Sequence, residues 1–303
     1  MSQQCDYREE KMSIYDKMGF ELVGYHQRLA YVRKGNSRRA FVFISGFNQP
    51  AESWEDTIKV INRSHTIVII VRRQENERAS HFLGWQSIAT QQREVVETIL
   101  QLKCHELIGL RLTIVGHSVG SMIARHCLSH LKISGCTDRL VQIAPVPLTW
   151  HDFAFHLTFW MKGGLLAVPY VFLALLGISR GLSPPRSAVQ GLFSGEINSD
   201  RFDDYFWSLV PDSALVFLQL TFWYNGTKEW EEVRSHWRGQ NMVIGAPTDT
   251  TISSRSIMRL IQTAASPMTR LYWFSHGTPH CYWLDRGVKL DNNLARLREI
   301  IED

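Results

Sequence analysis

The sequence has few cysteines and no apolar stretch among its first eleven residues. Five cysteines stand among 303 residues, an odd number with no Cys-x-x-Cys pair. Such a chain fits a reducing compartment better than a disulfide framework, which requires paired cysteines in an oxidising environment. Residues 1–11 are polar and charged, whereas a secretory signal peptide requires an apolar stretch there. We therefore expect a cytoplasmic protein.

Basic blocks, internal repeats and low-complexity linkers are missing too. Charged residues make up 20% of the sequence and hydrophobic residues 45%, the balance of a globular protein rather than a disordered one. The net charge is only +4, and no basic block is interleaved with aromatic residues, so we expect no nucleic-acid partner. The length allows a substantial core in one large domain or in one domain with an insertion. Nothing in the composition indicates the oligomeric state.

An uninterrupted apolar run of membrane-spanning length is also lacking. Residues 153–178 approach that length with Lys162 as their only formal charge, but Gly163, Gly164 and Pro169 interrupt them. We expect two short apolar helices that line an acyl pocket. A surface that dips into a lipid interface, giving peripheral membrane association, is the second interpretation.

The sequence does contain an alternation of strand-like and helical patterns. Short apolar runs predict eight strands, at 20–25, 29–33, 40–45, 66–71, 112–115, 140–144, 241–245 and 270–274. Helical patterns lie between most of them, including 83–103 and 253–265, and a closing helix extends to 301. Strands that alternate with helices predict an α/β protein with a mostly parallel central sheet flanked by helices.

The alternation stops between residues 148 and 240. This interval is far longer than an ordinary connection between neighbouring strands. We interpret it as a mainly helical cap inserted after the sixth strand. The expected organisation is a core built from residues 1–147 and 241–303, with the cap at 148–240.

The central motif is residues 112–122, Leu-Thr-Ile-Val-Gly-His-Ser-Val-Gly-Ser-Met. A β-branched strand runs into a glycine-flanked serine and then into a helix, the pattern of a turn that lifts a serine Oγ clear of a sheet. A Cβ at either flanking position would collide where strand and helix approach each other. A second Gly-x-Ser-x-Gly match, 177–181, follows an apolar helical run instead of a strand. The context favours Ser118 over Ser179 as a nucleophile.

A serine nucleophile needs a base, and the base needs an orienting carboxylate. In a sheet of this kind both should follow later strands, in the order Ser, Asp, His. Asp249 follows the seventh strand; its rivals are Asp152 and Asp212, and its structural alternative is a helix N-cap. His280 stands in a Gly/Pro turn after the last strand, and His276 is the alternative base.

Two backbone N–H groups are needed to stabilise an oxyanion. The residue after the nucleophile, Val119, supplies one of them. We expect the loop after the 40–45 strand to supply the other from Phe47, with its neighbour Asn48 as the alternative. We expect no metal and no cofactor.

These motifs resemble those of the α/β-hydrolase superfamily in its capped form, over residues 20–300. Residues 116–120 are similar to its nucleophile turn, 245–249 to its acid loop, and 277–280 to its histidine loop with proline in place of a usual glycine. Residues 45–47 are similar to its His-Gly-x oxyanion strand, except that Ser45 replaces the histidine. The resemblance implies a cofactor-free serine hydrolase, similar to esterases and lipases, with Ser118, Asp249 and His280 as the triad.

The aromatic content of the cap favours a hydrophobic ester as the small-molecule substrate. We expect its pocket to include Phe159, Trp160, Phe172 and Phe222. Thioesterase, amidase and carbon–carbon bond hydrolase activities use the same triad and remain alternatives. A non-catalytic protein of the same fold that binds a hydrophobic ligand is the alternative from another class.

Overall fold

The computed structural model describes residues 15–25, 28–71, 85–149, 165–179, 182–183, 185–192, 199–210, 212–249, 251–263, 268–278, 280–285 and 287–302. Its centre is an eight-stranded sheet in the order β1-β2-β4-β3-β5-β6-β7-β8. Only β2 runs against its neighbours, so the predicted mostly parallel sheet is confirmed. The strands are β1 Glu21–Tyr25, β2 Arg28–Arg33, β3 Arg39–Ile44, β4 Thr66–Val71, β5 Arg111–His117, β6 Thr137–Ile143, β7 Gln240–Gly245 and β8 Thr269–Trp273.

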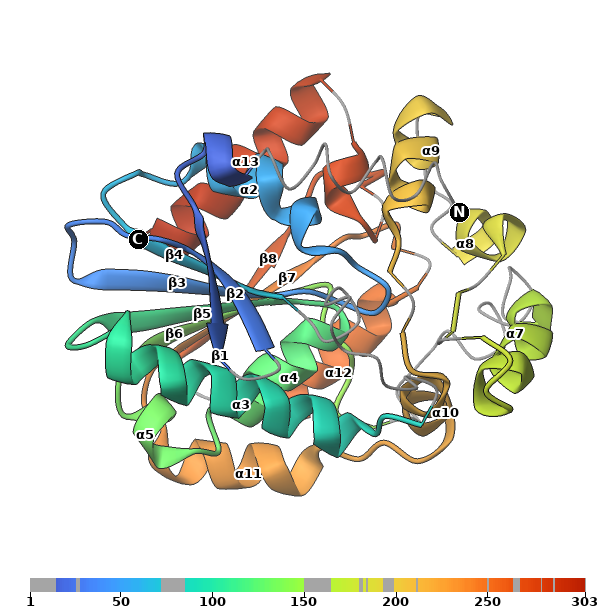
Figure 1. Cartoon of the computed structure of the whole chain (residues 1–303), viewed down its shortest axis with the longest axis horizontal. Helices are drawn as coiled ribbons and strands as arrows, with labels where there is room; N and C mark the ends of the chain where they lie inside the picture. The colour runs from blue at the N-terminus through green and yellow to red at the C-terminus, as the bar shows by residue number, and fades with distance from the viewer. Residues whose placement is uncertain are drawn as a thin grey trace.

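Helices cover both faces of this sheet (Figure 1). The helices are η1 Ala51–Trp54, α2 Glu55–Val60, α3 Ile88–His105, α4 Val119–Cys127, α5 Leu131–Ser134, α7 Leu165–Leu175, α8 Arg186–Leu192, α9 Ser199–Ser208, α10 Ala214–Phe222, α11 Thr227–His236, α12 Ser254–Thr263, η5 Tyr282–Leu284 and α13 Gly287–Glu302. Helices α2 and α13 lie on one face, and α3, α4 and α11 lie on the other. Among the described residues, no helix has the length and apolar character needed to cross a membrane.

The two faces of the sheet bury two separate apolar clusters. Along β3, Phe41 and Phe43 belong to the cluster on the α13 face, whereas Val42 and Ile44 belong to the cluster on the α4 face. Side chains alternate across a strand, so a strand covered on both faces must be apolar at every position. All six residues of β4, Thr-Ile-Val-Ile-Ile-Val, are buried accordingly. The core therefore lies on both sides of the sheet and fixes the carboxyl ends of its strands.

The interval between β6 and β7 contains five of the described helices, in two places. Helices α7 to α10, which we call the inserted helices, lie beyond the carboxyl ends of the parallel strands (Figure 1). Helix α11 lies under the sheet instead, where Trp230 and Val233 share a buried cluster with α4 residues such as Ile123. Only the inserted helices are therefore placed to cover a site at the strand ends.

Candidate active site

Ser118 occupies a strained turn between β5 and α4. Its backbone angles are φ 51° and ψ −120°, in the region that residues with a Cβ rarely adopt. Such conformations cost ~1–3 kcal/mol and are retained at functional sites. A Cβ on Gly116 would lie 2.5 Å from the Gly120 carbonyl oxygen, and one on Gly120 would lie 2.1 Å from that of Ile44. Both flanking glycines are therefore required by close backbone contacts, as the sequence pattern predicted.

His280 and Asp249 form a buried pair at the same edge of the sheet. The His280 Nδ1 atom lies 2.7 Å from Asp249 Oδ2, and both side chains are buried. The second carboxylate oxygen of Asp249 accepts the backbone N–H groups of Thr251, at 2.7 Å, and Ile252, at 2.9 Å. Because Nδ1–H donates to the carboxylate, a neutral His280 ring carries its lone pair on Nε2, the arrangement of a general base.

The alternatives for acid and base occupy other positions. Asp152 lies outside the described residues. Asp212 is buried, but its carboxylate accepts hydrogen bonds from Asn48 N and Gln91 Nε2. His276 lies on an exposed turn after β8. The Asp249–His280 pair is the one that the structure brings together.

His117 joins the loop of Ser118 to the loop of His280. Its Nε2 lies 3.0 Å from the His280 carbonyl oxygen, and the centroids of the two rings are 4.8 Å apart. Its Nδ1 lies 2.9 Å from Gln49 Oε1. Burial, followed by repulsion from His280 when that ring is charged, holds the pKa of His117 well below its ordinary value. His117 packed between the two loops therefore has a structural role.

The loop after β3 offers one N–H group to an oxyanion. The Gly46 N–H donates to Gln49 Oε1 at 2.6 Å, and the Asn48 N–H donates to Asp212 Oδ2 at 3.1 Å. In the described part of the chain, no acceptor engages the N–H of Phe47 or of Val119. Val119 is the first residue of α4, where a helix leaves N–H groups without an internal partner. The geometry therefore favours Phe47 over Asn48 as the partner of Val119.

Ser45 stands where the resemblance leads us to expect histidine. Its side chain is buried, and its Oγ accepts a hydrogen bond from Trp54 Nε1 at 3.1 Å. Trp54 in turn packs against Phe43, with ring centroids 5.0 Å apart. Ser45 therefore anchors the beginning of the loop to η1 and leaves the backbone N–H of Phe47 unaffected.

The apolar wall expected around the site is described only in part. Phe159 and Trp160 lie outside the described residues. Phe172 on α7 and Phe222 on α10 are exposed, by 60% and 43%. Phe217 of α10 lies closer to the loop, with its ring centroid 6.3 Å from that of Phe47. The inserted helices therefore place apolar surface beside the expected oxyanion donor.

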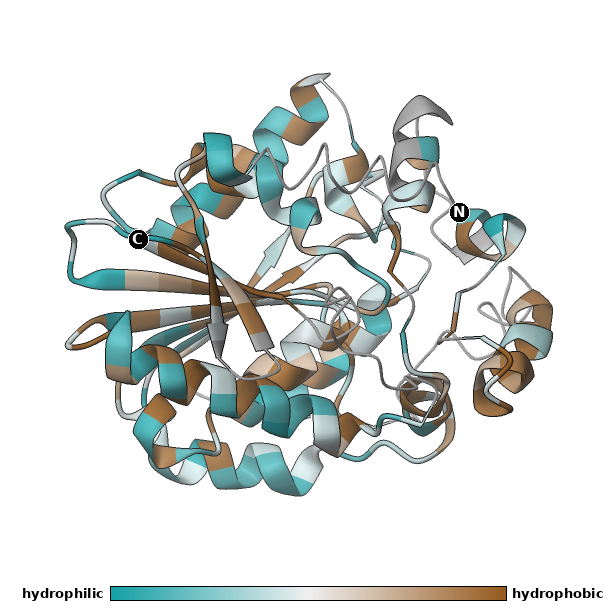
Figure 2. Ribbon diagram, in the orientation of Figure 1, coloured by the Kyte–Doolittle hydropathy of each residue, from teal (hydrophilic) through white to brown (hydrophobic). Residues whose placement is uncertain are grey.

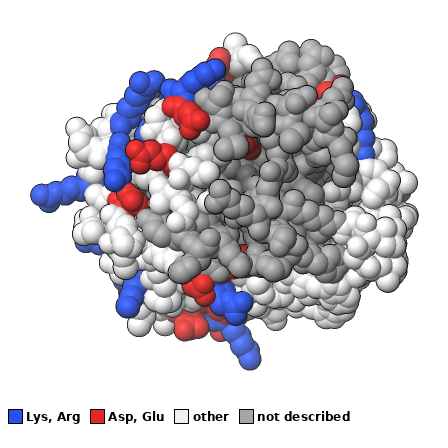
Figure 3. Space-filling model, viewed as in Figure 1, with Lys and Arg blue, Asp and Glu red and all other residues white. Residues whose placement is uncertain are grey.

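Helix α7 is mostly apolar (Figure 2), and it presents large side chains to solvent. Its buried residues are Ala167, Val171 and Ala174, whereas Leu165 is 66% exposed and Leu176, just after the helix, is 72% exposed. The right-hand side of the view in Figure 3, where α7 lies, carries few charges. Exposed apolar surface of this kind is typical of contact sites rather than of a solvated helix.

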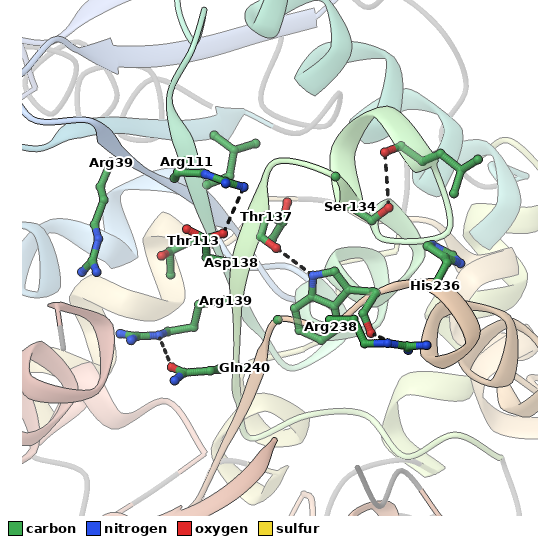
Figure 4. Close-up of a pocket in the computed structure, with 15 residues that line it drawn as sticks. Arg39, Arg111, Thr113, Ser134, Thr137, Asp138, Arg139, His236, Arg238 and Gln240 are labelled. Carbon is green, nitrogen blue, oxygen red and sulfur yellow. Dashed lines mark hydrogen bonds and ion pairs between the residues drawn. The ribbon is translucent and has the colours of Figure 1, made fainter. Parts of the chain in front are cut away.

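A cavity of about 610 Å³ lies at the amino ends of the central strands, and several arginines line it (Figure 4). Arg39 and Arg139 donate to carbonyls in the last turn of α13, and Arg238 donates to carbonyls in the last turn of α11. Arg111 pairs with Asp138 at 3.4 Å. Cations stabilise helix C-termini, where carbonyls lack internal partners. These arginines therefore have structural roles and lie far from the Asp249–His280 pair.

Comparison with known proteins gives structural matches only. No protein-family model matches the chain, and no curated protein matches it. A bromoperoxidase from Bacillus anthracis is similar in structure, with a TM-score of 0.67, 16% identity, and coverage of 93% of this chain and 98% of its own. A hydrolase from Oleispira antarctica has a TM-score of 0.63, 14% identity, and coverage of 93% and 100%. The serine hydrolase CCSP0084 from Cycloclasticus zankles has a TM-score of 0.62, 16% identity, and coverage of 94% and 99%.

Proposed function

Because the chain has the α/β-hydrolase fold, we propose that it is a serine hydrolase that cleaves carboxylic esters with an apolar acyl or alkyl group. The observation that carries this proposal is the 2.7 Å hydrogen bond between His280 Nδ1 and Asp249 Oδ2. His117 connects this pair to the turn of Ser118 through its contact with the His280 carbonyl. The similar structures include hydrolases, which agrees with the proposal at the level of reaction class.

In the first half of the proposed reaction, Ser118 Oγ attacks the ester carbonyl carbon while His280 Nε2 takes the hydroxyl proton. Asp249 stabilises the charged imidazole through Nδ1. The carbonyl oxygen becomes an oxyanion held by the N–H groups of Phe47 and Val119. The intermediate then collapses, the bond to the alkoxide breaks, and His280 delivers its proton to that leaving group.

In the second half, water releases the acid. His280 removes one proton from the water as its oxygen attacks the acyl carbon of the acyl-enzyme. Collapse of this second intermediate breaks the bond to Ser118 Oγ, which recovers a proton from His280. The products are one carboxylic acid and one alcohol, and the reaction requires no cofactor.

The apolar substrate class rests on the surroundings of Phe47. Its ring packs against a buried apolar cluster of the inserted helices that includes Val171, Leu182 and Ala214. An acyl group bound at the Phe47 N–H would adjoin this surface. Thioesterase, amidase and carbon–carbon bond hydrolase activities share the same groups and are tested beside the ester activity.

We expect kcat/KM for p-nitrophenyl esters to rise with acyl length until the pocket is full. One buried methylene contributes ~0.8 kcal/mol, or about a fourfold change in rate. Butyrate should therefore exceed acetate by roughly 15-fold. The measurement is initial rates across the acyl series, with labelling by a fluorophosphonate probe as a check that the serine is reactive.

Two results would contradict different parts of the proposal. A labelled, active enzyme whose rate falls with acyl length would exclude the apolar acyl pocket. A wild type inert towards activated esters, thioesters and amides, and unlabelled by the probe, would favour the ligand-binding alternative.

We also propose that the exposed face of α7 contacts a lipid surface. The supporting observations are its large apolar side chains and Trp85, whose indole donates to the Leu175 carbonyl at 2.8 Å beside the helix. Tryptophans with a bonded N–H are frequent at lipid–water boundaries.

We expect the protein to float with phospholipid vesicles in a density gradient. A Phe172→Ser/Leu176→Ser variant should remain in solution. Ile108→Ser, which removes an equally exposed residue at the end of α3, is the control, and equal flotation of all three proteins would contradict the proposal.

A further inference from the structure

Asp212 is a fully buried carboxylate at the junction of three segments. Its Oδ2 accepts the Asn48 N–H at 3.1 Å, from the loop after β3. Its Oδ1 accepts Gln91 Nε2 at 3.0 Å, from α3, and the Ser213 N–H at 2.7 Å, from the residue that caps α10. The three donors are neutral N–H groups, two from the backbone and one from a side-chain amide. Hydrogen bonds from such groups to an ionised carboxylate are short and strong.

Asn48 is held by the same part of the chain through its other polar groups. Its Nδ2 donates to the carbonyls of Leu182, at 3.0 Å, and Val210, at 2.7 Å. Its carbonyl accepts the Val210 N–H at 3.3 Å. Leu182 and Asp212 pair with each other as an isolated β-bridge, so the groups that bond to Asn48 also bond to one another. Asn48 has φ 55°, a left-handed conformation that asparagine adopts more readily than most other non-glycine residues.

These bonds determine which N–H group of the loop remains available. Gly46 N–H is committed to Gln49 and Asn48 N–H is committed to Asp212, which leaves Phe47 N–H between two anchored peptides. Rotation of the Phe47–Asn48 peptide would break the bond to Asp212 and turn the neighbouring peptide with it. The position of the Phe47 N–H therefore depends on a carboxylate supplied by the segment that leads into α10.

We propose that Asp212 is a positioning residue for the oxyanion site, acting through Asn48 to hold the Phe47 N–H towards the substrate carbonyl. This inference rests on the proposed serine hydrolase function. It extends that function to the inserted helices, because the site is complete only when the segment 210–213 is docked on the loop. Asp212 does not touch substrate; its effect passes through the loop backbone.

The test is an Asp212→Asn variant, in which an amide nitrogen or a weaker oxygen acceptor meets the Asn48 N–H. Loss of one oxyanion donor costs roughly 10²–10³-fold in kcat, so displacement of Phe47 should lower kcat by ~10–100-fold and leave KM within about threefold. The affinity of a trifluoromethyl ketone, whose hemiketal oxygen occupies the same position, should fall by a similar factor. A structural role alone would lower the melting temperature and leave both quantities unchanged in the folded protein.

Gln91→Met is the matched control, because it removes a donor from the other oxygen of Asp212 and retains the bond to Asn48. It should keep kcat and inhibitor affinity within about threefold of wild type. If Asp212→Asn behaves like Gln91→Met, the proposal is wrong.

Asn48→Gly provides a second route should Asp212→Asn fail to fold. Glycine accepts φ 55° and keeps the backbone bond to Asp212, but the variant loses the two side-chain bonds to Leu182 and Val210. Because the backbone bond to Asp212 persists, kcat and inhibitor affinity should fall by no more than about threefold. A loss as large as that expected for Asp212→Asn would assign the positioning to the side-chain bonds of Asn48 and overturn the role of Asp212 while the wild-type activity stands. A wild type that neither turns over esters nor reacts with a fluorophosphonate would instead refute the proposed function, and this inference with it.

Discussion

Ser118→Ala is expected to lower kcat for an activated ester by roughly 10⁵–10⁶-fold and to abolish labelling by a fluorophosphonate probe. The variant removes the atom that forms the acyl-enzyme, so only oxyanion binding and proximity remain. The fold should survive, because alanine carries the same Cβ at φ 51° that serine already places there. The backbone bonds of this turn, such as that from Ser118 N to the Ile143 carbonyl at 2.9 Å, are unaffected. Initial rates and gel-based labelling measure the two effects.

Ser179→Ala is the control, since Ser179 lies in the other Gly-x-Ser-x-Gly match. Its N–H donates to the Leu173 carbonyl at 3.3 Å, which places it in the turn that ends α7 rather than at the end of a strand. It should keep wild-type labelling and turnover. Substantial activity in Ser118→Ala, or its loss in Ser179→Ala, would reject Ser118 as the nucleophile.

His280→Ala should lower kcat by at least about 10⁴-fold, whereas His276→Ala should stay within about threefold of wild type. The reason is the position of each ring. His280 donates to a buried carboxylate that can stabilise its charge, and His276 stands exposed on the turn before it. An Asp249→Asn variant should fall between Ser118→Ala and wild type, because it disturbs the tautomer of His280 without removing the base.

Melting temperatures and labelling rates for these variants separate loss of catalysis from loss of fold. His280→Ala should fold and react slowly with the probe. The assignment of the base would be reversed if His276→Ala lost activity and His280→Ala kept it.

The sheet could be predicted closely from the sequence because its central strands are buried on both faces. Continuous β-branched runs such as 66–71 are unambiguous, and β4 has those same bounds. Helix limits were less accurate. Helix α3 starts at Ile88 rather than at the predicted residue 83, because Ser87 Oγ accepts the Thr90 N–H and caps the helix there. An apolar stripe does not by itself indicate which polar residue will cap the start of the helix.

The pairing of Asp249 with His280 could be anticipated because each follows a strand end, and parallel strands bring those ends to one edge. The preference for Phe47 over Asn48 had no comparable support in the sequence. It depends on a hydrogen bond from Asn48 to Asp212, across 164 residues, and no local pattern reports such a contact. In the sequence, Asp212 was a rival to Asp249 as the triad acid. In the structure its carboxylate is committed to the loop instead.

The hydrogen bonds between Asn48 and the segment around Val210 have a consequence for redesign. Exchange of lid regions between relatives is an attractive way to change substrate preference, and it treats the lid as a separable module. In this protein a chimaera that replaced residues 182–213 would also displace the four groups that bond to Asn48: the carbonyls of Leu182 and Val210, the Val210 N–H and the carboxylate of Asp212. A transplanted lid would therefore have to bring an equivalent acceptor for this loop, or substrate preference and catalytic power would change together.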